Sequence, residues 1–530
     1  MRNAVAGLRP LLKVTLRQDA RNIAPWLVLI SALSGSSVLV YPWIFPDAQS
    51  RAELSLTVSA NPAFSLVFGQ ARDLLSADGF NAWRAGALGA FFAGLMAILV
   101  VVRNSRAHED SGQAELIASG VVGRHTRLAV AVAMAWLASV ALGVLASLVT
   151  IALGGSAADS VTLAATFTAS GFMFAGVAAL TAQIGSEARS ATAMAVTILG
   201  VAFVARGFID TVGTPDWTMW LTPLGWTQEV RVAAENRWWP LLVCLAFALA
   251  TAALAAAVQS RRDFGLGLVP PRPGPSRARL VTSPWALALR INRAAVISWT
   301  IAFAALGTIF GFMATTVGDL FAENPQIALI IAAGGGSEEG LTFEFLGTLL
   351  KLVGIIAAVY GVAVVVRMYT EEVEHRAEPL LATALSRPRY LASNAAVALL
   401  APAVAVMLAG TLLGVTASAL EASIQIGDVL RQALATVPAT WTHVALALAI
   451  VGAKPARRFV AWMAVVASFA LTILGPLFTL WDWILGISPF WHVPNVAAAQ
   501  PDLSGLGWIS LVTLGLTAVG FAGFQRRDVL

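Results

Sequence analysis

The chain has 530 residues, of which 58% are apolar and 12% are charged, and its mean hydropathy is +0.77. A chain of this composition has too little polar surface for a soluble protein, and its apolar runs recur at the length needed to cross a bilayer. The formal net charge of +5 could suggest a nucleic-acid partner, but the basic residues lie in short loops and form no basic domain. The composition therefore predicts an all-α polytopic membrane protein, with the lipid bilayer as a partner and no nucleic acid.

The sequence offers little catalytic or metal-binding chemistry. Cys244 is the single cysteine, so neither a disulfide nor a Cys-based metal site can form within the chain. Lys13, Lys351 and Lys454 are the only lysines, and none follows the glycines of a phosphate-binding loop. No Gly-x-Ser-x-Gly or His-Glu-x-x-His motif occurs. We therefore expect a chain that is not an enzyme and holds no metal or cofactor of its own.

Taken in order, the chain begins with an amphipathic lead-in helix at 1–22, in which basic residues and leucines alternate at helical spacing on the inner leaflet. Six spans follow, near residues 23–44, 83–102, 128–154, 161–185, 190–209 and 239–258. Residues 259–283 are rich in proline and arginine and predict an extended cytoplasmic linker. A second lead-in helix is expected at 284–293. Six more spans are expected near 294–316, 345–366, 391–420, 429–452, 459–479 and 508–524.

Sequence landmarks recur in the two halves. The matching pairs are Leu16-Arg17 with Leu289-Arg290, Thr222-Pro223 with Ser488-Pro489, and Arg261-Arg262-Asp263 with Arg526-Arg527-Asp528. They predict two parallel six-span repeats, residues 1–258 and 284–530, each with its lead-in helix. Internal symmetry of this kind favours a transport pathway at the interface between the halves.

The distribution of basic residues predicts the orientation. The loop at 317–344 has five acidic and no basic residues, as expected of an outer loop, whereas lysines and arginines concentrate at the termini, the linker and the loops after the second spans. We expect a multi-pass protein of the plasma (inner) membrane with both termini cytoplasmic. The tryptophan-rich segments 210–237 and 480–507 predict short interfacial or re-entrant helices at the outer side.

Two charged islands, residues 103–127 and 367–391, follow the second span of each half. They share a glutamate, an Ala-Glu pair and an arginine nine residues later: Glu109, Glu115 and Arg124 in the first, Glu372, Glu378 and Arg387 in the second. Glu115 and Glu378 open short segments that can be helical. The islands could be duplicated solvated loops, but topology demands only basic residues, so their many acidic residues favour a docking role for a partner protein.

One polar residue inside a span is a candidate for substrate binding. His443 lies beside Thr440 and Thr442 in the span at 429–452. It could contact cargo or carry protons, and the simpler interpretation is a hydrogen-bonded packing histidine.

With these features the chain resembles the fused twelve-span permease subunits of ABC-2-type ABC exporters, in particular the actinobacterial exporters of polyketide antibiotics. The resemblance rests on the lead-in helices, the two islands, the Pro223 to Trp226 segment and the terminal Arg-Arg-Asp of each half. One departure is Pro489-Phe490-Trp491-His492, where the first half has Pro-Leu-Gly-Trp.

The resemblance implies a partner, a cytosolic ABC ATPase that forms a homodimer and carries ATP and Mg. It also implies that lead-in helices and islands touch this ATPase, with contacts from Arg17, Arg290, Glu109, Glu115, Arg124, Glu372, Glu378 and Arg387.

The expected function is export of amphipathic or lipophilic small molecules by alternating access between the halves, because the spans offer few polar side chains. A proton-driven transporter of the major-facilitator type is the alternative, since it also has twelve spans in two parallel halves. That fold, however, carries a Gly-x-x-x-Asp-Arg-x-Gly-Arg-Arg loop that is missing here and does not need lead-in helices.

Overall fold

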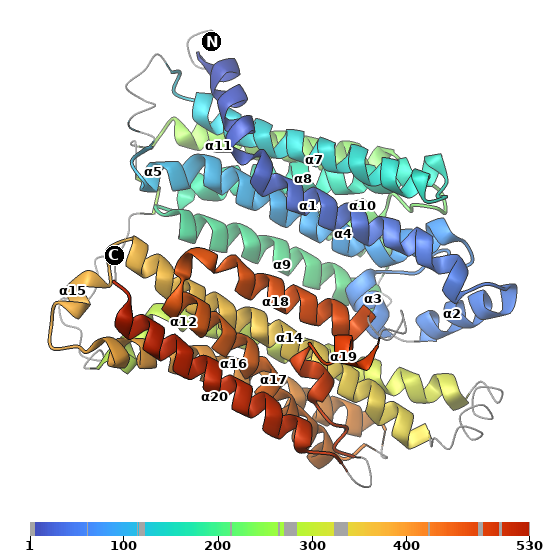
Figure 1. The fold of residues 1–530 in the computed structure, drawn as a ribbon. Helices are drawn as coiled ribbons and strands as arrows, with labels where there is room; N and C mark the ends of the chain where they lie inside the picture. The colour runs from blue at the N-terminus through green and yellow to red at the C-terminus, as the bar shows by residue number, and fades with distance from the viewer. Residues whose placement is uncertain are drawn as a thin grey trace. The chain divides into compact units, whose positions relative to one another are not determined.

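The computed structural model describes residues 6–60, 62–113, 115, 122–212, 215–262, 266–269, 283–322, 338–421, 424–474, 481–497 and 501–528. Every regular element in these ranges is helical (Figure 1). The chain divides into two compact units, Met1–Gly274 and Pro275–Leu530. The division lies within the segment 259–283 that the sequence predicts to be a linker. We call the two units the first and the second half and describe each by itself.

The first half is built on six long helices. These are α1 (Leu8–Ile44), α4 (Ala77–Val102), α7 (Thr126–Ala152), α8 (Ala157–Ile184), α9 (Ala188–Val212) and α11 (Trp239–Gln259). Shorter helices connect them: α2 (Ala48–Ala60), α3 (Pro62–Phe68), η2 (Arg103–Ala107), α5 (His108–Asp110), η3 (Asp216–Leu221) and α10 (Pro223–Gln228).

The second half repeats this order. Its long helices are α12 (Pro284–Ala322), α14 (Glu338–Val373), α16 (Arg387–Leu420), α17 (Ile426–Ala453) and α20 (Ser504–Arg526), with the shorter α18 (Phe459–Phe469) before α20. The connecting helices are α15 (Glu378–Leu381), η4 (Pro455–Arg457), η5 (Ala470–Leu474), α19 (Asp482–Leu485) and η7 (Pro489–His492). Short helices are present in both tryptophan-rich segments, namely η3 and α10 in the first half and α19 and η7 in the second. Their place at the outer membrane surface stays a prediction.

Eleven helices in the described part of the chain are long and apolar enough to cross a membrane. They match eleven of the twelve expected spans, which confirms an all-α polytopic membrane protein. The exception is the span expected at 459–479. Here α18 passes into the π-helical turn η5, which ends at Leu474, and residues 475–480 lie outside the described ranges. The described part of this helix is shorter than a crossing requires.

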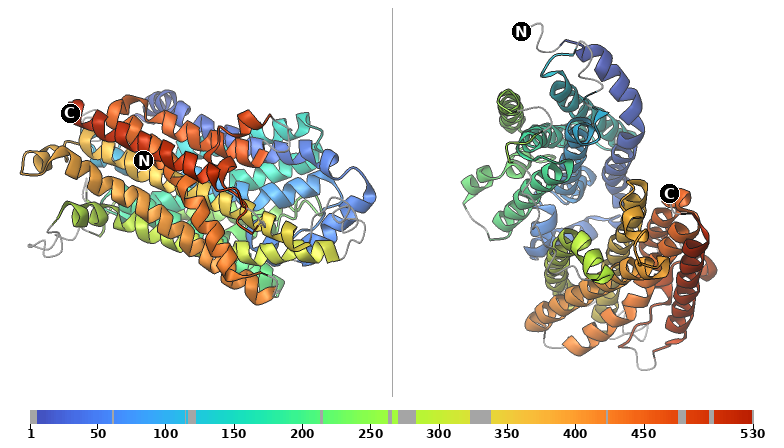
Figure 2. Two further views of the ribbon diagram at one scale, coloured as in Figure 1. Left: turned by 60° about the horizontal axis from the view of Figure 1, so that its bottom comes forward. Right: turned by 90° about the vertical axis from the view of Figure 1, so that its left-hand side faces the viewer.

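The same helix pairs pack together in both halves. Figure 2 shows the long helices of each half gathered into a bundle. Helix α1 packs against α7 as α12 packs against α16, and α4 packs against α8 as α14 packs against α17. In the same way, α7 and α11 both pack against α8, as α16 and α20 both pack against α17. The fourth span is central in each half, because 72% of the most apolar stretch of α8 and of α17 is buried. Each half therefore has the same set of contacts between its long helices.

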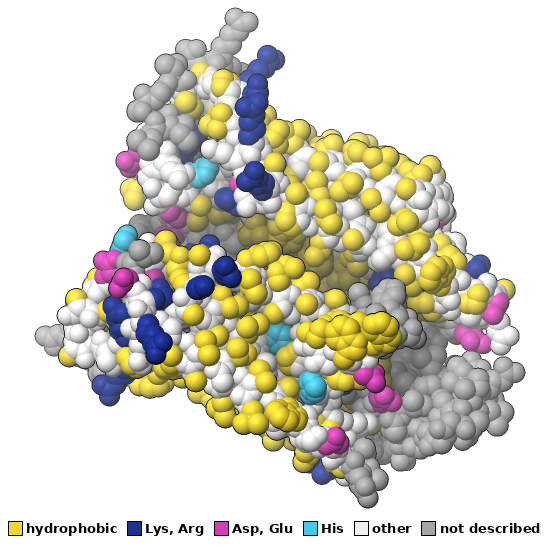
Figure 3. All heavy atoms as spheres, in the orientation of Figure 1, with side chains coloured by type: hydrophobic (Ala, Val, Ile, Leu, Met, Phe, Trp, Pro, Cys, Tyr) yellow, Lys and Arg dark blue, Asp and Glu magenta, His cyan; other side chains and the backbone are white. Residues whose placement is uncertain are grey.

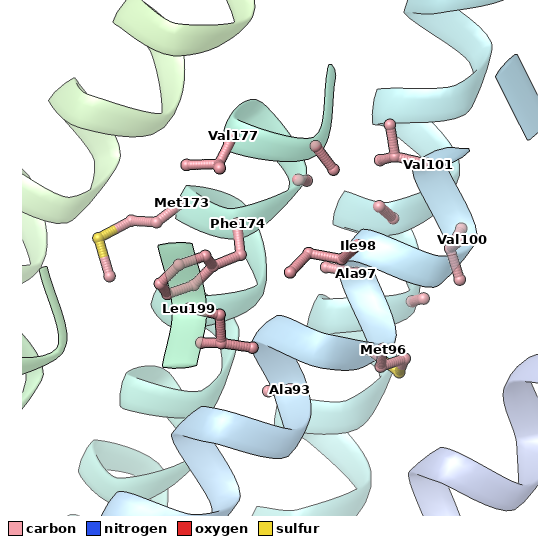
Figure 4. Packing of buried hydrophobic residues seen from close by; sticks show 14 of the residues in the cluster. Ala93, Met96, Ala97, Ile98, Val100, Val101, Met173, Phe174, Val177 and Leu199 are labelled. Atoms are coloured by element: carbon pink, nitrogen blue, oxygen red, sulfur yellow. The ribbon is translucent and has the colours of Figure 1, made fainter. Parts of the chain in front are cut away.

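The core of the first half depends on small residues that let helices approach closely. A Cβ atom on Gly94 of α4 would come within 2.8 Å of the Phe174 ring of α8. Figure 4 shows this ring among Ile98, Val177 and Leu199, between helices α4, α8 and α9. Close approach through small residues is typical of helix packing in membranes, where lipid provides no hydrophobic drive between helices.

The outer flanks of the helices remain apolar. Figure 3 shows apolar side chains along the visible flanks of both halves, and Lys and Arg gathered toward the end of each half where its island lies. Exposed leucines, valines and isoleucines on α1, α7, α16 and α20 form these flanks. In a soluble protein such patches would promote aggregation, whereas in a bilayer they contact lipid. We call the end of each half that carries its island (residues 103–127 or 367–391) the island end.

Each lead-in helix is continuous with the span that follows it. Helix α1 has 37 residues and α12 has 39, and both cross the expected boundaries at 22 and 293 without interruption. Pro25 lies inside α1, where a proline can kink a helix without ending it, and no glycine lies at the junction. The structure therefore differs from the expected division into a surface helix and a separate span.

The second span of the first half contains one residue more than its counterpart. Glu109 lies six positions after Arg103, whereas Glu372 lies five positions after Arg367. Helix α4 continues into the π-helical turn η2, while α14 stays α-helical to Val373. A π-helical turn accommodates an additional residue. The turn thus brings Glu109 to the place that Glu372 occupies in the second half.

Candidate functional site

In the first half, Glu109 on α5 lies at the centre of three arginines. Its carboxylate is 3% exposed and pairs with Arg106, Arg127 and Arg262. Arg262 contacts both oxygens, with Nη2 2.9 Å from Oε1 and Nη1 3.2 Å from Oε2. A buried carboxylate needs such partners, because a buried charge without a partner is costly. We call these four residues the first-half charge cluster.

The cluster joins the ends of four long helices. Arg106 lies in η2, directly after α4, and its Nε donates to the carbonyl oxygen of Gly185 at the end of α8, at 2.9 Å. Arg127 lies in the first turn of α7, and Arg262 follows α11. The carboxylate of Glu109 and its arginines therefore connect the island to the ends of α4, α7, α8 and α11 within its own half.

The second half has a simpler version of the same contact. Arg527, which follows α20, donates from Nη2 to Oε2 of Glu372 at 2.6 Å, and the Glu372 side chain is 1% exposed. The Arg527 guanidinium lies over the Phe524 ring, 4.9 Å from its centroid. Oε1 of Glu372 and Nε of Arg527 have no hydrogen-bond partner among the described residues. One arginine thus does in the second half what three do in the first.

The two island arginines expected at the docking surface bind backbone carbonyl groups of their own half. Arg124 donates from Nη2 to Ser260 O at 2.9 Å, just beyond the end of α11. Arg387 donates from Nη1 to Arg527 O at 2.8 Å, just beyond the end of α20. A cation at a helix C-terminus satisfies carbonyl groups that have no partner within the helix. Arg124 and Arg387 thereby attach the start of the third span to the end of the last.

The remaining predicted residues are exposed. Glu115 is exposed, and the side chain of Glu378 is 49% exposed, with one oxygen 2.7 Å from Nδ1 of His375. Arg17 and Arg290 are exposed on α1 and α12. The short helix predicted after Glu378 is confirmed as α15, with Pro379 at its N-terminus. Its counterpart after Glu115 falls on residues 116–121, outside the described ranges.

Contact of any of these residues with an ATPase remains a prediction. The geometry sorts the residues into two groups. Glu109, Glu372, Arg124 and Arg387 are used for contacts within their half. Glu115 and Glu378 have side chains that a partner protein can reach.

His443 is buried in the second half, and both of its ring nitrogens have hydrogen-bond partners. The residue is 3% exposed, its Nδ1 is 3.0 Å from Ala439 O, and its Nε2 is 2.8 Å from the Ser468 hydroxyl. Its ring stacks on Phe490 with centroids 5.5 Å apart. Both ring nitrogens already have partners, which is what a packing histidine requires. As for metals, the described ranges contain no group of three or more His, Cys, Asp or Glu that could hold an ion.

The sequence did not identify the arginines that bind the two buried glutamates. Arg262 and Arg527 were recognised only as landmarks of the repeat, and Arg106 and Arg127 were given no role. A signal was present, because the glutamate and the later arginine are separated by nearly the same length of chain in both halves, 153 and 155 residues. A repeat that preserves two opposite charges at a nearly constant separation suggests an ion pair.

Comparison with known proteins gives two matches. The family model for the multidrug efflux system permease Rv1217c, C-terminal domain, matches residues 52–258 and 281–525. The multidrug efflux system permease protein Rv1217c of Mycobacterium tuberculosis (strain ATCC 25618 / H37Rv) is 34% identical over 534 residues, which cover 99% of this chain and 95% of the relative. The similarity extends over both halves and includes both charged islands.

Proposed function

The chain belongs to the family of multidrug efflux system permeases to which Rv1217c belongs, and from this premise we propose that it is the transmembrane subunit of an ATP-driven ABC exporter. In this proposal the chain lies in the plasma membrane with both termini in the cytoplasm. It works with a cytosolic ABC ATPase, a homodimer that carries the ATP and Mg. The chain itself has no phosphate-binding loop that could cradle a nucleotide.

The observation that carries the proposal is the attachment of each island to its bundle. Glu109 with Arg262, and Glu372 with Arg527, connect the segment after the second span to the end of the last span. Buried ion pairs with good geometry resist separation, because breaking one leaves an uncompensated charge in an apolar surrounding. A force applied to an island would therefore move the helices of that half as a body.

The exposed carboxylates next to these attachments supply the docking contacts. Glu115 and Glu378 lie a few residues beyond the buried glutamates, on the part of each island that reaches solvent. We assign them direct contact with basic residues of the ATPase, and Arg17 and Arg290 contact with its acidic residues. The side chains of Glu109, Glu372, Arg124 and Arg387 are engaged within their own half, so they position the islands and do not touch the ATPase themselves.

The cargo in this proposal is amphipathic or lipophilic, and it crosses by alternating access between the two halves. Few polar side chains line the spans, so favourable contact in the membrane is mostly apolar. Clamping of the ATPase dimer on ATP would push both islands, and each half would respond as a body through its attachment. The relative's name, which describes multidrug efflux, agrees with a lipophilic and chemically broad cargo.

Transport in inverted membrane vesicles of the native host tests the energy source. Vesicles from the parent strain and from a strain lacking this gene receive a lipophilic fluorescent dye, and ATP or a proton gradient is supplied separately. Uptake that depends on the gene and on ATP, stops with vanadate and survives a protonophore is the expected result. Gene-dependent uptake driven by the proton gradient without ATP would contradict the proposal and favour the major-facilitator alternative.

A further inference from the structure

A cavity of about 420 Å³ lies at the start of α20, within the size range of small-molecule sites. Helix α20 begins at Ser504 and ends at Arg526, next to the contact between Arg527 and Glu372 at the island end. The start of α20 therefore lies at the opposite end of the second half. Aromatic and hydrogen-bonding residues line the cavity, among them Trp491 of η7, Asn495, Asp502 and Trp508.

The first half uses the aromatic side chains of the corresponding segment for internal packing. Trp226 donates from Nε1 to Trp220 O at 2.7 Å, and the Trp220 ring stacks on Trp239 with centroids 4.9 Å apart. Gly225 is the counterpart of Trp491 in the repeat. A Cβ atom on Gly225 would come within 2.2 Å of a backbone carbonyl oxygen, so a tryptophan cannot take this place in the first half. The departure of the second half from the shared sequence therefore gives it an aromatic side chain that lines a cavity.

Two tryptophans of the cavity have accessible side chains. Trp491 is 44% exposed and Trp508 is 68% exposed, and both line the cavity. Exposed tryptophans are common at membrane interfaces, but these two share one cavity. The faces of an indole ring carry negative electrostatic potential, so they attract a cation placed over them. Two such rings at one cavity favour a positively charged ligand.

The charge around the cavity is negative. Asp502 is exposed, and its Oδ1 accepts a hydrogen bond from Ser504 N at 2.9 Å. Hydrogen bonding by the hydroxyl and the backbone N–H of Ser504 lowers the pKa of Asp502, so its carboxylate is charged at neutral pH. The described residues that line the cavity include no Lys or Arg, and the segment 480–507 contains neither. A positively charged ligand would therefore meet an opposite charge here, and an anion would not.

We propose that this cavity binds an organic cation, a protonated or quaternary amine with an apolar part, through the rings of Trp491 and Trp508 and the carboxylate of Asp502. Tryptophan is the most effective aromatic partner of a cation, and a carboxylate at the same cavity adds direct attraction. The inference rests on the proposed function for its place in transport, because the end away from the islands then faces outward. An amphipathic cargo with a positive charge would meet the site as it leaves the membrane.

The test measures saturable binding of radiolabelled phenyltrimethylammonium to the purified full-length chain in phosphatidylglycerol nanodiscs, with empty nanodiscs as the blank. The matched competitor is tert-butylbenzene, which has the same shape without the charge. Compared by free concentration in water, the unlabelled cation should displace the label about tenfold more effectively than tert-butylbenzene, a ratio that cation–π contact and an opposite charge can supply. Equal displacement by the two compounds, or no saturable binding, would overturn the proposal.

Two variants and two controls locate the site. Trp508→Leu and Asp502→Asn should each weaken binding of the labelled cation about tenfold. Trp481→Leu and Asp482→Asn change an exposed tryptophan and an exposed aspartate of the same segment that do not line the cavity, and they should bind as the wild type does. Undiminished binding by both cavity variants, or an equal loss in the two controls, would contradict the proposal. The comparison of the two competitors on the wild type remains decisive if a variant fails to fold.

A change of lipid distinguishes two sources of the cation. Phosphatidylglycerol is mixed with either phosphatidylethanolamine or an uncharged glycolipid, so that the surface charge of the nanodisc stays the same. Weaker binding of the label with phosphatidylethanolamine supports a lipid headgroup as the occupant, and unchanged binding supports a soluble cation such as cargo. Binding is measured without ATPase or ATP, so its failure leaves ATP-driven export untouched, and a failure of the vesicle experiment leaves this site untouched.

Discussion

Arg262 donates hydrogen bonds from both terminal nitrogens to the carboxylate of Glu109, at 2.9 and 3.2 Å, across 153 residues of chain. Arg527 makes the corresponding contact with Glu372 across 155 residues. In each half this pair joins the segment after the second span to the end of the last span. The islands are therefore built into their bundles through these pairs, while the carboxylates of Glu115 and Glu378 reach solvent.

The first prediction compares a buried and an exposed glutamate of one island. Glu109→Gln leaves three arginines around a neutral amide, so we expect a loss of about 3–5 kcal/mol in stability and low membrane abundance. Glu115→Gln changes an exposed side chain and should alter stability by less than about 0.5 kcal/mol. Thermal denaturation of both variants in the same detergent measures the difference. Equal denaturation temperatures would mean that the charge cluster does not hold the first half together.

The second prediction concerns exchange of charges within the pairs. Glu372→Arg and Arg527→Glu should each destabilise the second half, and the double variant should regain about 0.5–3 kcal/mol, because the pair is restored with reversed polarity. Glu109→Arg with Arg262→Glu should show no such recovery. Arg106 and Arg127 would then face the introduced arginine.

A double-mutant cycle on denaturation of the purified chain checks this difference between the halves. Recovery in the first half as large as in the second would contradict the three-arginine arrangement around Glu109.

The third prediction concerns the close contact between α4 and α8. Gly94→Ala places a methyl group 2.8 Å from the Phe174 ring, so we expect overpacking to cost about 1–3 kcal/mol. Gly200→Ala on α9 is the matched control, because no other element in the described part of the chain comes within 4 Å of its added Cβ. There alanine should be neutral or stabilising by about 0.5–1 kcal/mol, as expected for glycine replacement within a helix. A loss of thermal stability for Gly94→Ala, with no loss for Gly200→Ala, is the expected outcome.

The fourth prediction concerns His443. Its two ring nitrogens bind Ala439 O and the Ser468 hydroxyl, so His443→Phe should keep the stacking on Phe490 but leave Ser468 without this partner. We expect lower stability, by about 1–3 kcal/mol, and an unchanged rank order of the compounds to which the protein confers resistance. Growth assays at matched membrane abundance provide the measurement. A changed rank order would assign His443 to the cargo pathway.

Much of the architecture could be predicted because it depends on local properties of the sequence. Span positions follow from apolar runs of sufficient length, and eleven of twelve are confirmed. The short helix α15 follows from Glu378 and Pro379 at its start. Continuity of α1 through residue 22 could not be predicted, because an amphipathic segment and an apolar segment can form one helix when no residue between them ends it.

The roles of the island residues could be predicted only in part, because burial is a property of the folded chain. Glu109 and Glu115 are both acidic residues in one hydrophilic segment, yet one is 3% exposed and the other lies in solvent. The difference arises from Arg262, which is distant in sequence. Likewise, Glu109 lies one position further from Arg103 than Glu372 lies from Arg367, and only the π-helical turn η2 explains this difference.

Reversal of the two exposed island charges tests the central claim most directly. Glu115→Arg and Glu378→Arg add positive charge to segments expected in the cytoplasm, so insertion should be preserved. Docking to the ATPase should fail, because like charges placed opposite each other at an interface cost several kcal/mol. Glu344→Arg, an exposed reversal on the other end of α14, is the control and should leave export intact.

The measurement is drug export by the double variant Glu115→Arg with Glu378→Arg, at membrane abundance equal to wild type and with co-purification of the ATPase recorded in parallel. The account predicts that export and co-purification are lost together while Glu344→Arg retains both. Undiminished export by the double variant would contradict it and identify the islands as duplicated solvated loops.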